Sequence, residues 1–319
     1  STRALSSAAS DVYKRQGQRL DKYLLKVFPK LPKSLMYKEI RKKNIKINKK
    51  RTQPDYIIKE GEEISLYLKD DVLEEKKKHY DFTKAPTELN ILYEDENIML
   101  IDKQPGLLCH PDGKEYTATL IAAVKRRLFK SGEWKPDDDE AFTPSLANRI
   151  DRNTGGIVIA AKNAQALRIL NDKIKTREIE KHYLAAVHGR FDIKSAELTA
   201  YLTKNERTNT VSVFDKEKPC SKKIITEYTV IDEYGDYSLL DIDLKTGRTH
   251  QIRAHMAHIG HPLLNDGKYG TEEGRFRQAL YSYKLIFNIK DAGILNYLAG
   301  REFTAENCEI LRKFKERKF

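Results

Sequence analysis

Residues 148–161 read Asn148-Arg149-Ile150-Asp151-Arg152-Asn153-Thr154-Gly155-Gly156-Ile157-Val158-Ile159-Ala160-Ala161. An ionisable aspartate between two arginines enters a turn, and a short apolar run typical of a buried β-strand follows. We therefore expect Asp151 to occupy a fixed place at the rim of a sheet. A carboxylate flanked by guanidinium groups stays ionised, and the same arginines can hold a phosphate backbone. The pattern favours an enzyme that acts on nucleic acid through one aspartate.

Two later segments place further polar side chains in regular patterns. The first is a strand pattern with one central tyrosine, and it reads Arg177-Glu178-Ile179-Glu180-Lys181-His182-Tyr183-Leu184-Ala185-Ala186-Val187-His188-Gly189. A tyrosine beside an extruded base would stack on it and exclude water, whereas a lone strand tyrosine is more often part of a core. The second segment reads Leu244-Lys245-Thr246-Gly247-Arg248-Thr249-His250-Gln251-Ile252-Arg253-Ala254-His255, and Gly260-His261-Pro262-Leu263 follows it.

These three segments resemble the motifs of the RluA-type ribosomal large-subunit pseudouridine synthases. The usual forms are His-Arg-Leu-Asp-Arg-Asp-Thr-Ser-Gly, Lys-x-Tyr-x-Ala-x-Val-x-Gly and Gly-Arg-Thr-His-Gln-Ile-Arg-x-His. The chain departs from the first form at Asn148, where His is usual, and at Gly155, where Ser is usual.

The resemblance covers residues 89–319 and implies a fold, a reaction and a substrate. The fold is α+β, the pseudouridine synthase fold with a mostly antiparallel mixed sheet. The reaction is the isomerisation of uridine to pseudouridine in structured RNA after base flipping, with large-subunit (23S) ribosomal RNA or a ribosome-assembly particle as the expected partner. The resemblance implies neither a cofactor nor a metal.

It also implies roles for single residues. Asp151 matches the catalytic aspartate, Tyr183 the tyrosine that packs against the target base, and Arg253 the arginine that pairs with the aspartate. Arg149 matches the arginine that fills the space left by the extruded base. Asp151 could add to the ribose, add to the base, or remove the ribose 2′ proton, and the sequence leaves these three openings undecided. The other expected substrate-binding residues of these motifs are Arg152, Arg248, His250 and Gln251.

Basic side chains gather near the N-terminus. Residues 20–28 carry apolar side chains at helical spacing, and Ser34 is expected to cap a second helix. Between Lys33 and Arg51 there are nine Lys or Arg and one acid, Glu39, a net charge of +8. Such density suits an RNA backbone recognised by shape and phosphate, although a solvated basic face is a common alternative. The helix–helix–strand order resembles the alpha-L RNA-binding motif. The expected RNA-binding residues are Lys33, Lys38, Arg41, Lys42, Lys43, Lys46, Lys49, Lys50 and Arg51.

These patterns divide the chain into four parts. Residues 1–16 are rich in Ser and Ala without apolar periodicity, and we expect a disordered or non-native leader. Residues 17–70 form the expected alpha-L RNA-binding domain, residues 71–88 a linker, and residues 89–319 the pseudouridine synthase catalytic domain. Strand-like runs at 91–103, 240–244 and 281–289 mix with a few helices without regular β–α alternation. This mixture predicts an α+β protein with a largely antiparallel sheet.

The composition agrees with an RNA partner. The 319 residues carry a formal net charge of +12 and a pI of about 9.3, which favours a polyanion and leaves room for one large core. No apolar run approaches membrane-spanning length, and we find no secretory signal pattern. Cys109, Cys220 and Cys308 are scattered, as expected of reduced thiols in the cytoplasm. We expect a monomer.

Two metal sites compete with this interpretation of the motifs. An Asp-x-Asn-x-x-Gly run can open a calcium loop, but Gly155 and Lys162 stand where oxygen ligands belong. Four histidines also crowd one region, and imidazoles at short helical spacing can share zinc. Asp266 is the only carboxylate near them and no cysteine is close, so no metal site is expected. The four are His250, His255, His258 and His261.

Two other functions compete as well. A zinc deaminase would need His-x-Glu and Cys-x-x-Cys pairs, which the sequence lacks. A non-catalytic RNA-binding or ribosome-assembly protein that kept the fold is the main alternative. The joint presence of Asp151, Tyr183 and Arg253 argues against it.

Overall fold

The computed structural model describes residues 3–5, 18–28, 31–59, 61–68, 81–112, 115–136, 142–205, 208–270, 277–306 and 308–319. The chain divides into two compact units, Ser1–Asp81 with Trp134–Ala141 and Phe82–Glu133 with Phe142–Phe319. Of the expected leader only residues 3–5 lie within the described ranges, and of the expected linker only residues 81–88. No helix in these ranges is long and apolar enough to cross a membrane.

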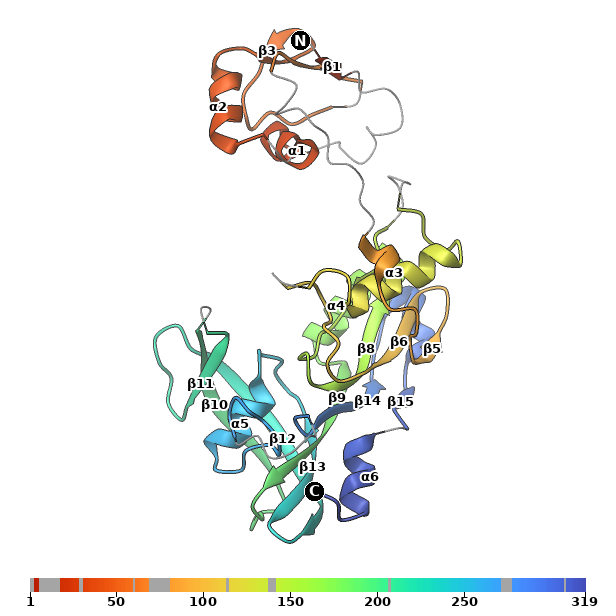
Figure 1. Ribbon diagram of the computed structural model, residues 1–319, viewed down its shortest axis with the longest axis vertical. Helices are drawn as coiled ribbons and strands as arrows, with labels where there is room; N and C mark the ends of the chain where they lie inside the picture. Colours follow the sequence, from red (N-terminus) through yellow and green to blue (C-terminus); the bar gives the residue numbers. More distant parts are fainter. Residues whose placement is uncertain are drawn as a thin grey trace. The chain divides into compact units, whose positions relative to one another are not determined.

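The first unit is a small sheet with two helices (Figure 1). The helices are α1 (Leu20–Val27) and α2 (Lys33–Arg41), and Pro32 rather than Ser34 occupies the N-cap of α2, without a side-chain cap. Apolar side chains of both helices and of β2 and β4 share one core, which includes Leu24, Met36 and Ile45. The antiparallel strand order is β1-β4-β2-β3, with bounds β1 (Arg3–Leu5), β2 (Ile45–Ile47), β3 (Lys50–Arg51) and β4 (Ile64–Leu66).

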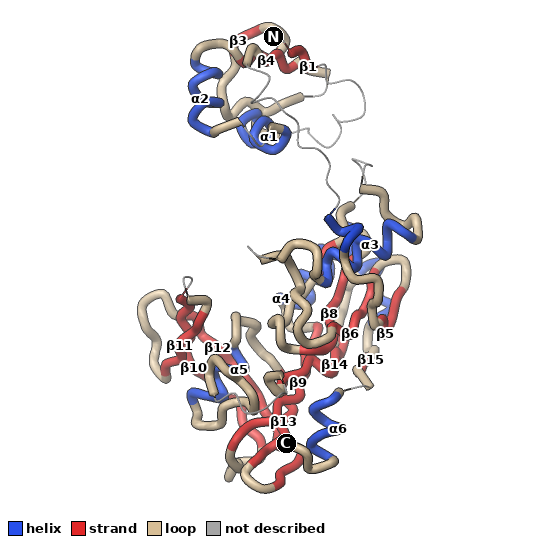
Figure 2. The backbone as a smooth tube through the Cα atoms, viewed as in Figure 1, coloured by secondary structure: helices blue, strands red, loops and turns tan. Residues whose placement is uncertain are grey.

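The second unit is built on one mixed sheet of eleven strands, drawn in red in Figure 2. Its main path runs β11-β10-β12-β13-β9-β14-β8-β6-β5, with β15 paired to β14 and β7 to β8. Only the β14–β8 pair is parallel, so the expected α+β class with a mostly antiparallel sheet is confirmed. The strands are β5 (Ile91–Glu94), β6 (Ile98–Lys103), β7 (Ser145–Leu146), β8 (Gly155–Ala161), β9 (Ile179–His188), β10 (Ser195–Asn205), β11 (Thr210–Phe214), β12 (Lys222–Tyr234), β13 (Tyr237–Asp243), β14 (Leu280–Phe287) and β15 (Glu302–Thr304).

Helices cover this sheet in two places. Leu170 of α4 and Phe314 of α6 join an extensive core, with side chains of β6, β8, β9 and β14. Ala254 of α5 joins a smaller core with residues of β10, β11 and β12, and Figure 1 shows α5 beside these strands. The helical elements are α3 (Leu120–Lys130), α4 (Ala164–Lys175), α5 (Gln251–His258) and α6 (Glu309–Lys315), with 3-10 turns η2 (Asp81–Lys84) and η3 (Gly293–Leu298).

The start of β8 lies unusually close to β14. Gly156 has a φ of +111°, and a Cβ atom there would lie 2.1 Å from the backbone oxygen of Ser282. Only glycine can therefore occupy this position. Because β8 starts four residues after Asp151, this close approach ties the aspartate's turn to the centre of the sheet.

Candidate active site

Asp151 lies in the turn between β7 and β8, and buried side chains hold the backbone on both sides of it. The Lys103 ammonium group, 1% exposed, donates hydrogen bonds to the carbonyl of Arg152 at 3.1 Å and to two carbonyls of the loop after β6. The Cys109 thiol donates to the carbonyl of Ile150 at 3.4 Å. The residues before and after Asp151 are therefore both fixed from β6 and its loop.

The two departures from the usual motif have structural explanations in this chain. Asn148 accepts a hydrogen bond from the backbone N–H of Ile159 at 2.8 Å through its side-chain oxygen, which ties the segment before Asp151 to β8. At Gly155, an added Cβ would lie 2.5 Å from the ring of Tyr281. The Tyr281 ring thus fills the space that a side chain at position 155 would need.

Arg253 connects two carboxylates. From α5 it donates one hydrogen bond to Asp151 at 3.0 Å and two to Asp266, both at 2.7 Å. Asp266 is 0% exposed. Burial opposes ionisation of Asp266, yet the hydrogen bonds and charge of Arg253 lower its pKa. Burial likewise opposes the charge of Arg253, but the bonds to Asp266 raise its pKa. Asp266 therefore fixes the guanidinium group that faces Asp151.

His250 and Gln251 shape the loop around this pair. His250 adopts a left-handed conformation (φ 50°), and its ring bonds the Tyr269 hydroxyl at 2.8 Å and lies 3.9 Å from the Asp151 carboxylate. Burial lowers the pKa of His250, which favours the neutral imidazole. Gln251 is buried, and its amide bonds Thr246, the backbone N–H of Arg248, and two groups of β12. Its side chain holds the loop that carries Arg248, so we expect any effect on substrate to pass through that loop.

Tyr183 lies in β9, the strand between β13 and β14. Its neighbours across the sheet are Ile242 and Ser282. The residue is 5% exposed, and burial raises the pKa of its phenol, so that the ring stays neutral. It lines the same cavity as Asp151, where its ring can offer a flat apolar surface.

Two adjoining cavities share Asp151. The first, of about 510 Å³ and here called the Tyr183 cavity, contains Arg149, Tyr183, Arg248 and Arg253 in its walls. The second, of about 910 Å³, contains Arg149, Arg152 and Arg253. Both also include His250. The structure thus brings the residues predicted from three separate motifs to one place.

The walls of the Tyr183 cavity are strongly basic. Asp151 is their only carboxylate, against seven lysines and arginines: Arg149, Lys175, Arg177, Lys181, Lys204, Arg248 and Arg253. A hollow with this excess of positive charge attracts a polyanion.

The four histidines considered as zinc ligands do not converge on a single point. Their ring nitrogens contact four different partners: His250 bonds Tyr269, His255 bonds Thr226, His258 bonds Asp215, and His261 bonds the carbonyl of His188.

Within the described ranges, one cluster of possible metal ligands has its ligand atoms within 4.8 Å of one another. It consists of Glu180, His182 and Asp243. Asp243 already pairs with Lys245, and His182 pairs with Asp241 at 3.1 Å. These pairs engage two of the three groups that a cation would need.

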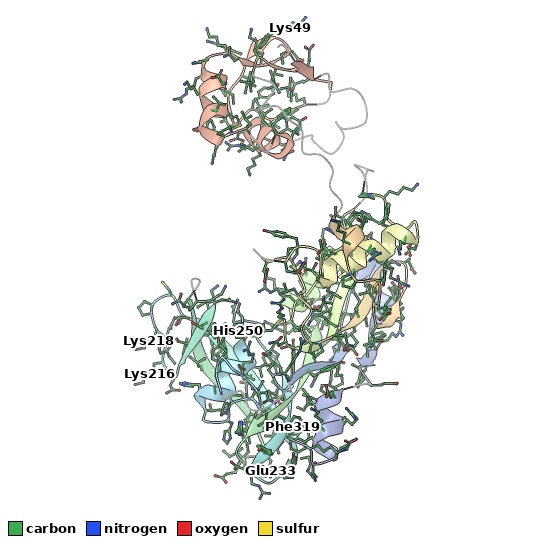
Figure 3. All side chains as sticks on the ribbon, viewed as in Figure 1. Lys49, Lys216, Lys218, Glu233, His250 and Phe319 are labelled. Atoms are coloured by element: carbon green, nitrogen blue, oxygen red, sulfur yellow. The ribbon has the colours of Figure 1, made fainter. Side chains whose placement is uncertain are left out.

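The basic residues of the first unit lie on its surface. All nine are exposed except half-buried Lys46, and Figure 3 shows Lys49 extending away from the fold. Among these residues in the described part of the chain, the one ion pair joins Lys42 to Glu39 at 3.9 Å. The structure therefore leaves the predicted RNA-binding side chains available to phosphates.

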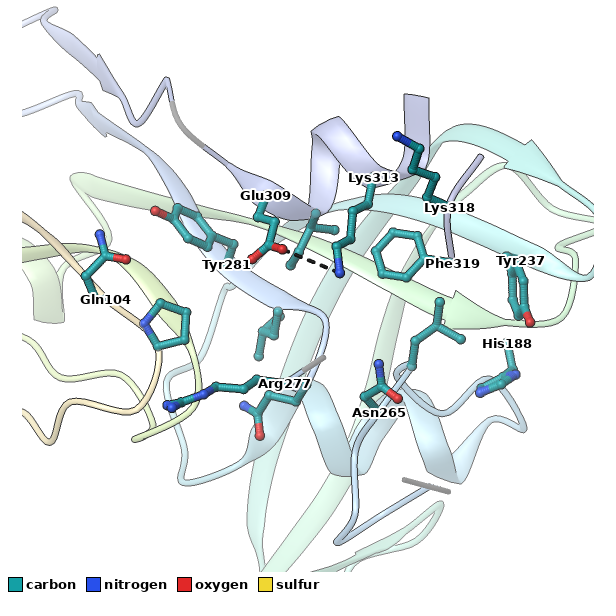
Figure 4. Close-up of a pocket in the computed structure, with 15 residues that line it drawn as sticks. Gln104, His188, Tyr237, Asn265, Arg277, Tyr281, Glu309, Lys313, Lys318 and Phe319 are labelled. Atoms are coloured by element: carbon teal, nitrogen blue, oxygen red, sulfur yellow. Dashed lines mark ion pairs between the residues drawn. The ribbon is translucent and has the colours of Figure 1, made fainter. Parts of the chain in front are cut away.

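A third cavity, of about 580 Å³, contains none of the predicted catalytic residues (Figure 4). Its walls include Arg277, Tyr281 and Phe319, and the ion pair between Glu309 and Lys313 at 3.4 Å lies along one side. It shares Arg277 with the larger cavity beside Asp151.

Three residues of the site were missed by sequence reasoning. Lys103 ends a strand whose six residues are all buried, and a lysine in such a run was a detectable signal. Lys181 matches the lysine of the second motif, to which no role was given, and it lies two residues before Tyr183 on the same strand face. Asp266 was considered only as a metal ligand. Its bond to Arg253 joins residues 13 apart across a loop, and the sequence gives no sign of it.

Comparison with known proteins identifies two regions. Residues 97–258 match the family of RNA pseudouridylate synthases, and residues 18–64 match the S4 domain. The first match covers Asp151, Tyr183 and Arg253, and the second covers all nine basic residues of the first unit.

Relatives resemble the chain over most of its length. An uncharacterized RNA pseudouridine synthase of Mycoplasma genitalium is 34% identical, over 85% of this chain and 86% of the relative. Ribosomal large subunit pseudouridine synthase C of Haemophilus influenzae is 30% identical, over 95% of this chain and 93% of the relative. Synthase D of Borreliella burgdorferi is also 30% identical, over 86% and 84%.

Solved structures share the fold. Human RNA pseudouridylate synthase domain containing 4 superposes with a TM-score of 0.56 at 18% identity, over 72% of this chain and 92% of that one. Human RNA pseudouridylate synthase domain containing 1 superposes with a TM-score of 0.52 at 20% identity, over 72% of this chain and 95% of that one.

Proposed function

The chain belongs to the RNA pseudouridylate synthase family, and on that premise we propose that it modifies large-subunit ribosomal RNA through Asp151. The observation that carries this assignment is the pair of Asp151 and Arg253, 3.0 Å apart, in a hollow with a large excess of positive charge. The named relatives that act on the ribosomal large subunit support the choice of substrate. We also propose that the enzyme works in the cytoplasm as a monomer on free RNA or on a ribosome-assembly particle.

The reaction begins with extrusion of the target base. Leaving the stack costs roughly a few kcal/mol. Arg149, exposed at the mouth of both cavities, is placed to fill the vacated space and to hold the flanking phosphate. Tyr183 offers its ring to the extruded uracil.

The isomerisation exchanges one bond of the uracil for another. The N1–C1′ bond breaks, a C5–C1′ bond forms, the proton on C5 leaves, and N1 gains a proton. Atoms and electrons balance without an oxidant or another reactant. The detached uracil has to turn in place, so the walls near Tyr183 and Arg253 must confine it.

Each of the three possible openings uses Asp151 as a carboxylate. Because Asp266 fixes Arg253 from behind, the hydrogen bond from Arg253 keeps the Asp151 carboxylate oriented. Since Arg253 shares its single positive charge between two carboxylates, Asp151 retains negative charge with which to act.

Mapping of pseudouridine tests this proposal. A large-subunit ribosomal RNA transcript is incubated with the wild-type protein, with Asp151→Asn, and with Asp172→Asn as a control at an exposed carboxylate outside both cavities. The wild type and the control should form pseudouridine at the same sites. Asp151→Asn should lose turnover by roughly 10⁴-fold or more while still binding RNA. Normal turnover by Asp151→Asn would refute the role of this residue, and an unmodified transcript with all proteins would refute the substrate.

A further inference from the structure

Lys181 is a buried lysine that pairs with no carboxylate in the part of the chain that the structure describes. It lies in β9, is 6% exposed, and lines the Tyr183 cavity. Among the described residues, no hydrogen bond or ion pair engages its ammonium group. A buried charge of this kind costs free energy unless a partner of opposite sign is present. Within the described ranges the ammonium group is therefore available to an anion of the substrate.

Nearby carboxylates are already engaged elsewhere. Glu178 receives two hydrogen bonds from Lys173, at 2.9 and 3.1 Å. Asp243 attracts Lys181 but pairs with Lys245. Burial is the main cause that lowers the pKa of Lys181 to about 8, and the positive charge of Arg177 adds to it.

Two arginines add to the positive charge beside Lys181. Arg177 precedes β9 in a left-handed conformation (φ 67°), which is strained for a residue with a side chain. Burial, followed by the repulsion of Arg248, lowers the pKa of Arg177. Arg177 repels both Lys181 and Arg248, so an anion bound beside these side chains would relieve that repulsion. A neutral uracil carbonyl would offset little of that repulsion.

We propose that Lys181, with Arg177 and Arg248, binds a backbone phosphate of the RNA next to the extruded uridine. This inference rests on the proposed function, because it assigns a subsite in the same cavity.

The position of Lys181 relative to Tyr183 fits one nucleotide. The two residues are separated by one residue along β9, so their side chains emerge on the same face roughly 6.6–7 Å apart. This spacing resembles that between the base and the phosphate of a nucleotide. With the base on Tyr183 and a phosphate on Lys181, the sugar would lie between them near Asp151. Lys181 is thus a residue that positions the ribose for the reaction.

Three variants test the subsite in the full-length protein. Lys181→Met removes the charge and keeps the apolar stem, Lys181→Arg keeps the charge, and Lys290→Met is a control at an exposed lysine outside the cavities. Binding of a large-subunit ribosomal RNA transcript is measured over a range of salt concentrations, together with kcat and KM for pseudouridine formation. Thermal unfolding of each variant is recorded.

Lys181→Met should reduce the slope of log affinity against log salt by about 0.7–0.9, the value for one phosphate contact. It should lower kcat/KM by roughly tenfold or more, and Lys181→Arg should restore most of both. Thermal stability of Lys181→Met should equal or exceed that of the wild type, because a buried unpaired charge is removed. Lys290→Met should leave kcat/KM unchanged.

Several results would overturn the subsite. An unchanged salt slope would do so, and if kcat fell while the salt slope stayed the same, Lys181 would act on the base rather than on a phosphate. A lower melting temperature for Lys181→Met would show that the lysine is structural. Added inorganic phosphate tests whether the site binds free phosphate rather than RNA. We expect it to raise the melting temperature of the wild type very little. A large rise in the wild type that is absent in Lys181→Met would show that the site binds free phosphate. An inactive wild type would refute the proposed function, while the salt slopes would still report on the phosphate contact.

Discussion

Positive charge is arranged in two different ways in this molecule. In the first unit, nine basic residues between Lys33 and Arg51 lie on the surface, and eight of them are exposed. In the second unit, Arg253 is buried and donates three hydrogen bonds to two carboxylates. The exposed basic side chains are solvated and can substitute for one another, whereas the guanidinium group of Arg253 is held in one orientation. The first arrangement suits affinity for any phosphate backbone, and the second suits a single reacting nucleotide.

The two arrangements should respond differently to substitution. Loss of one exposed charge weakens a long-range attraction slightly. Loss of one partner in a buried network leaves the other groups without their bonds and moves the reacting carboxylate. The contrast therefore predicts changes in RNA affinity from the first unit and changes in turnover from the cavity.

The largest effect outside the catalytic aspartate is expected from Asp266→Asn. The amide removes the negative charge and replaces one acceptor with a donor, so Arg253 loses its fixed orientation beside Asp151. We expect kcat to fall roughly 10²-fold, the usual result of a small misplacement in an active site. RNA affinity should change little. Steady-state kinetics on the ribosomal RNA transcript, with Asp172→Asn as the control, measure both. A loss of affinity at constant kcat would break the contrast between the two regions.

A second test compares two buried lysines. Burial lowers the pKa of both Lys103 and Lys181 to about 8, but Lys103 donates three hydrogen bonds to backbone carbonyls. Lys103→Met should therefore lower the free energy of unfolding by roughly 1–3 kcal/mol, because buried carbonyls lose their donor. Lys181→Met should not lower it. Urea unfolding of both variants measures the two free energies of unfolding. Equal losses would show that the stability effect of each lysine depends on its burial and not on its hydrogen bonds.

The sequence predicted the parts of this fold that depend on local patterns. Period-two stripes predicted the strands near residues 240–244 and 281–289, two short apolar runs predicted those at 91–103, and charge density predicted the basic face of the first unit. The motifs also gave the three residues that meet in the Tyr183 cavity, Asp151, Tyr183 and Arg253. The predicted cap at Ser34 was wrong because Pro32 enters α2 without a side-chain cap.

Contacts between distant residues could not be predicted in this way. Asp266 and Lys103 act through hydrogen bonds to Arg253 and to the backbone of Arg152, and neither bond leaves a periodic signal in the sequence. Gly155 also seemed a simple departure from the usual serine. Its reason is the ring of Tyr281, which belongs to a strand more than a hundred residues away.

A smaller effect on turnover is expected from the first unit. Replacement of Lys42, Lys43, Lys49 and Lys50 together by Gln removes four exposed charges. The salt slope of RNA binding should fall by roughly 3, and affinity should fall accordingly. At saturating RNA, kcat should stay the same. The matched control replaces the same four lysines by Arg, which keeps the charge. If the Gln variant instead modified different uridines, the first unit would select the site and the proposed contrast would fail.

The smallest effect concerns His182, which pairs with Asp241 across β9 and β13 at 3.1 Å. The hydrogen bond to Asp241 raises the pKa of His182 above its ordinary 6.5. Its stabilising contribution is therefore complete below pH 6.5 and is lost as the pH rises through the raised value. We expect His182→Gln to lower the free energy of unfolding by less than about 1 kcal/mol, and only at the lower pH. Urea unfolding below and above this range measures it, and a pH-independent cost would contradict the charged pair.

The Arg253 bond also bears on the order in which the molecule becomes competent during its synthesis. Asp151 receives its partner from a residue 102 positions later in the chain, and Gly156 is enclosed by β14, later still. A nascent polypeptide that ends before residue 253 would contain the aspartate motif without its partner. Contacts this distant in sequence form late in folding. We therefore expect the emerging chain to gain activity only after residue 253 has been synthesised, well after the basic first unit.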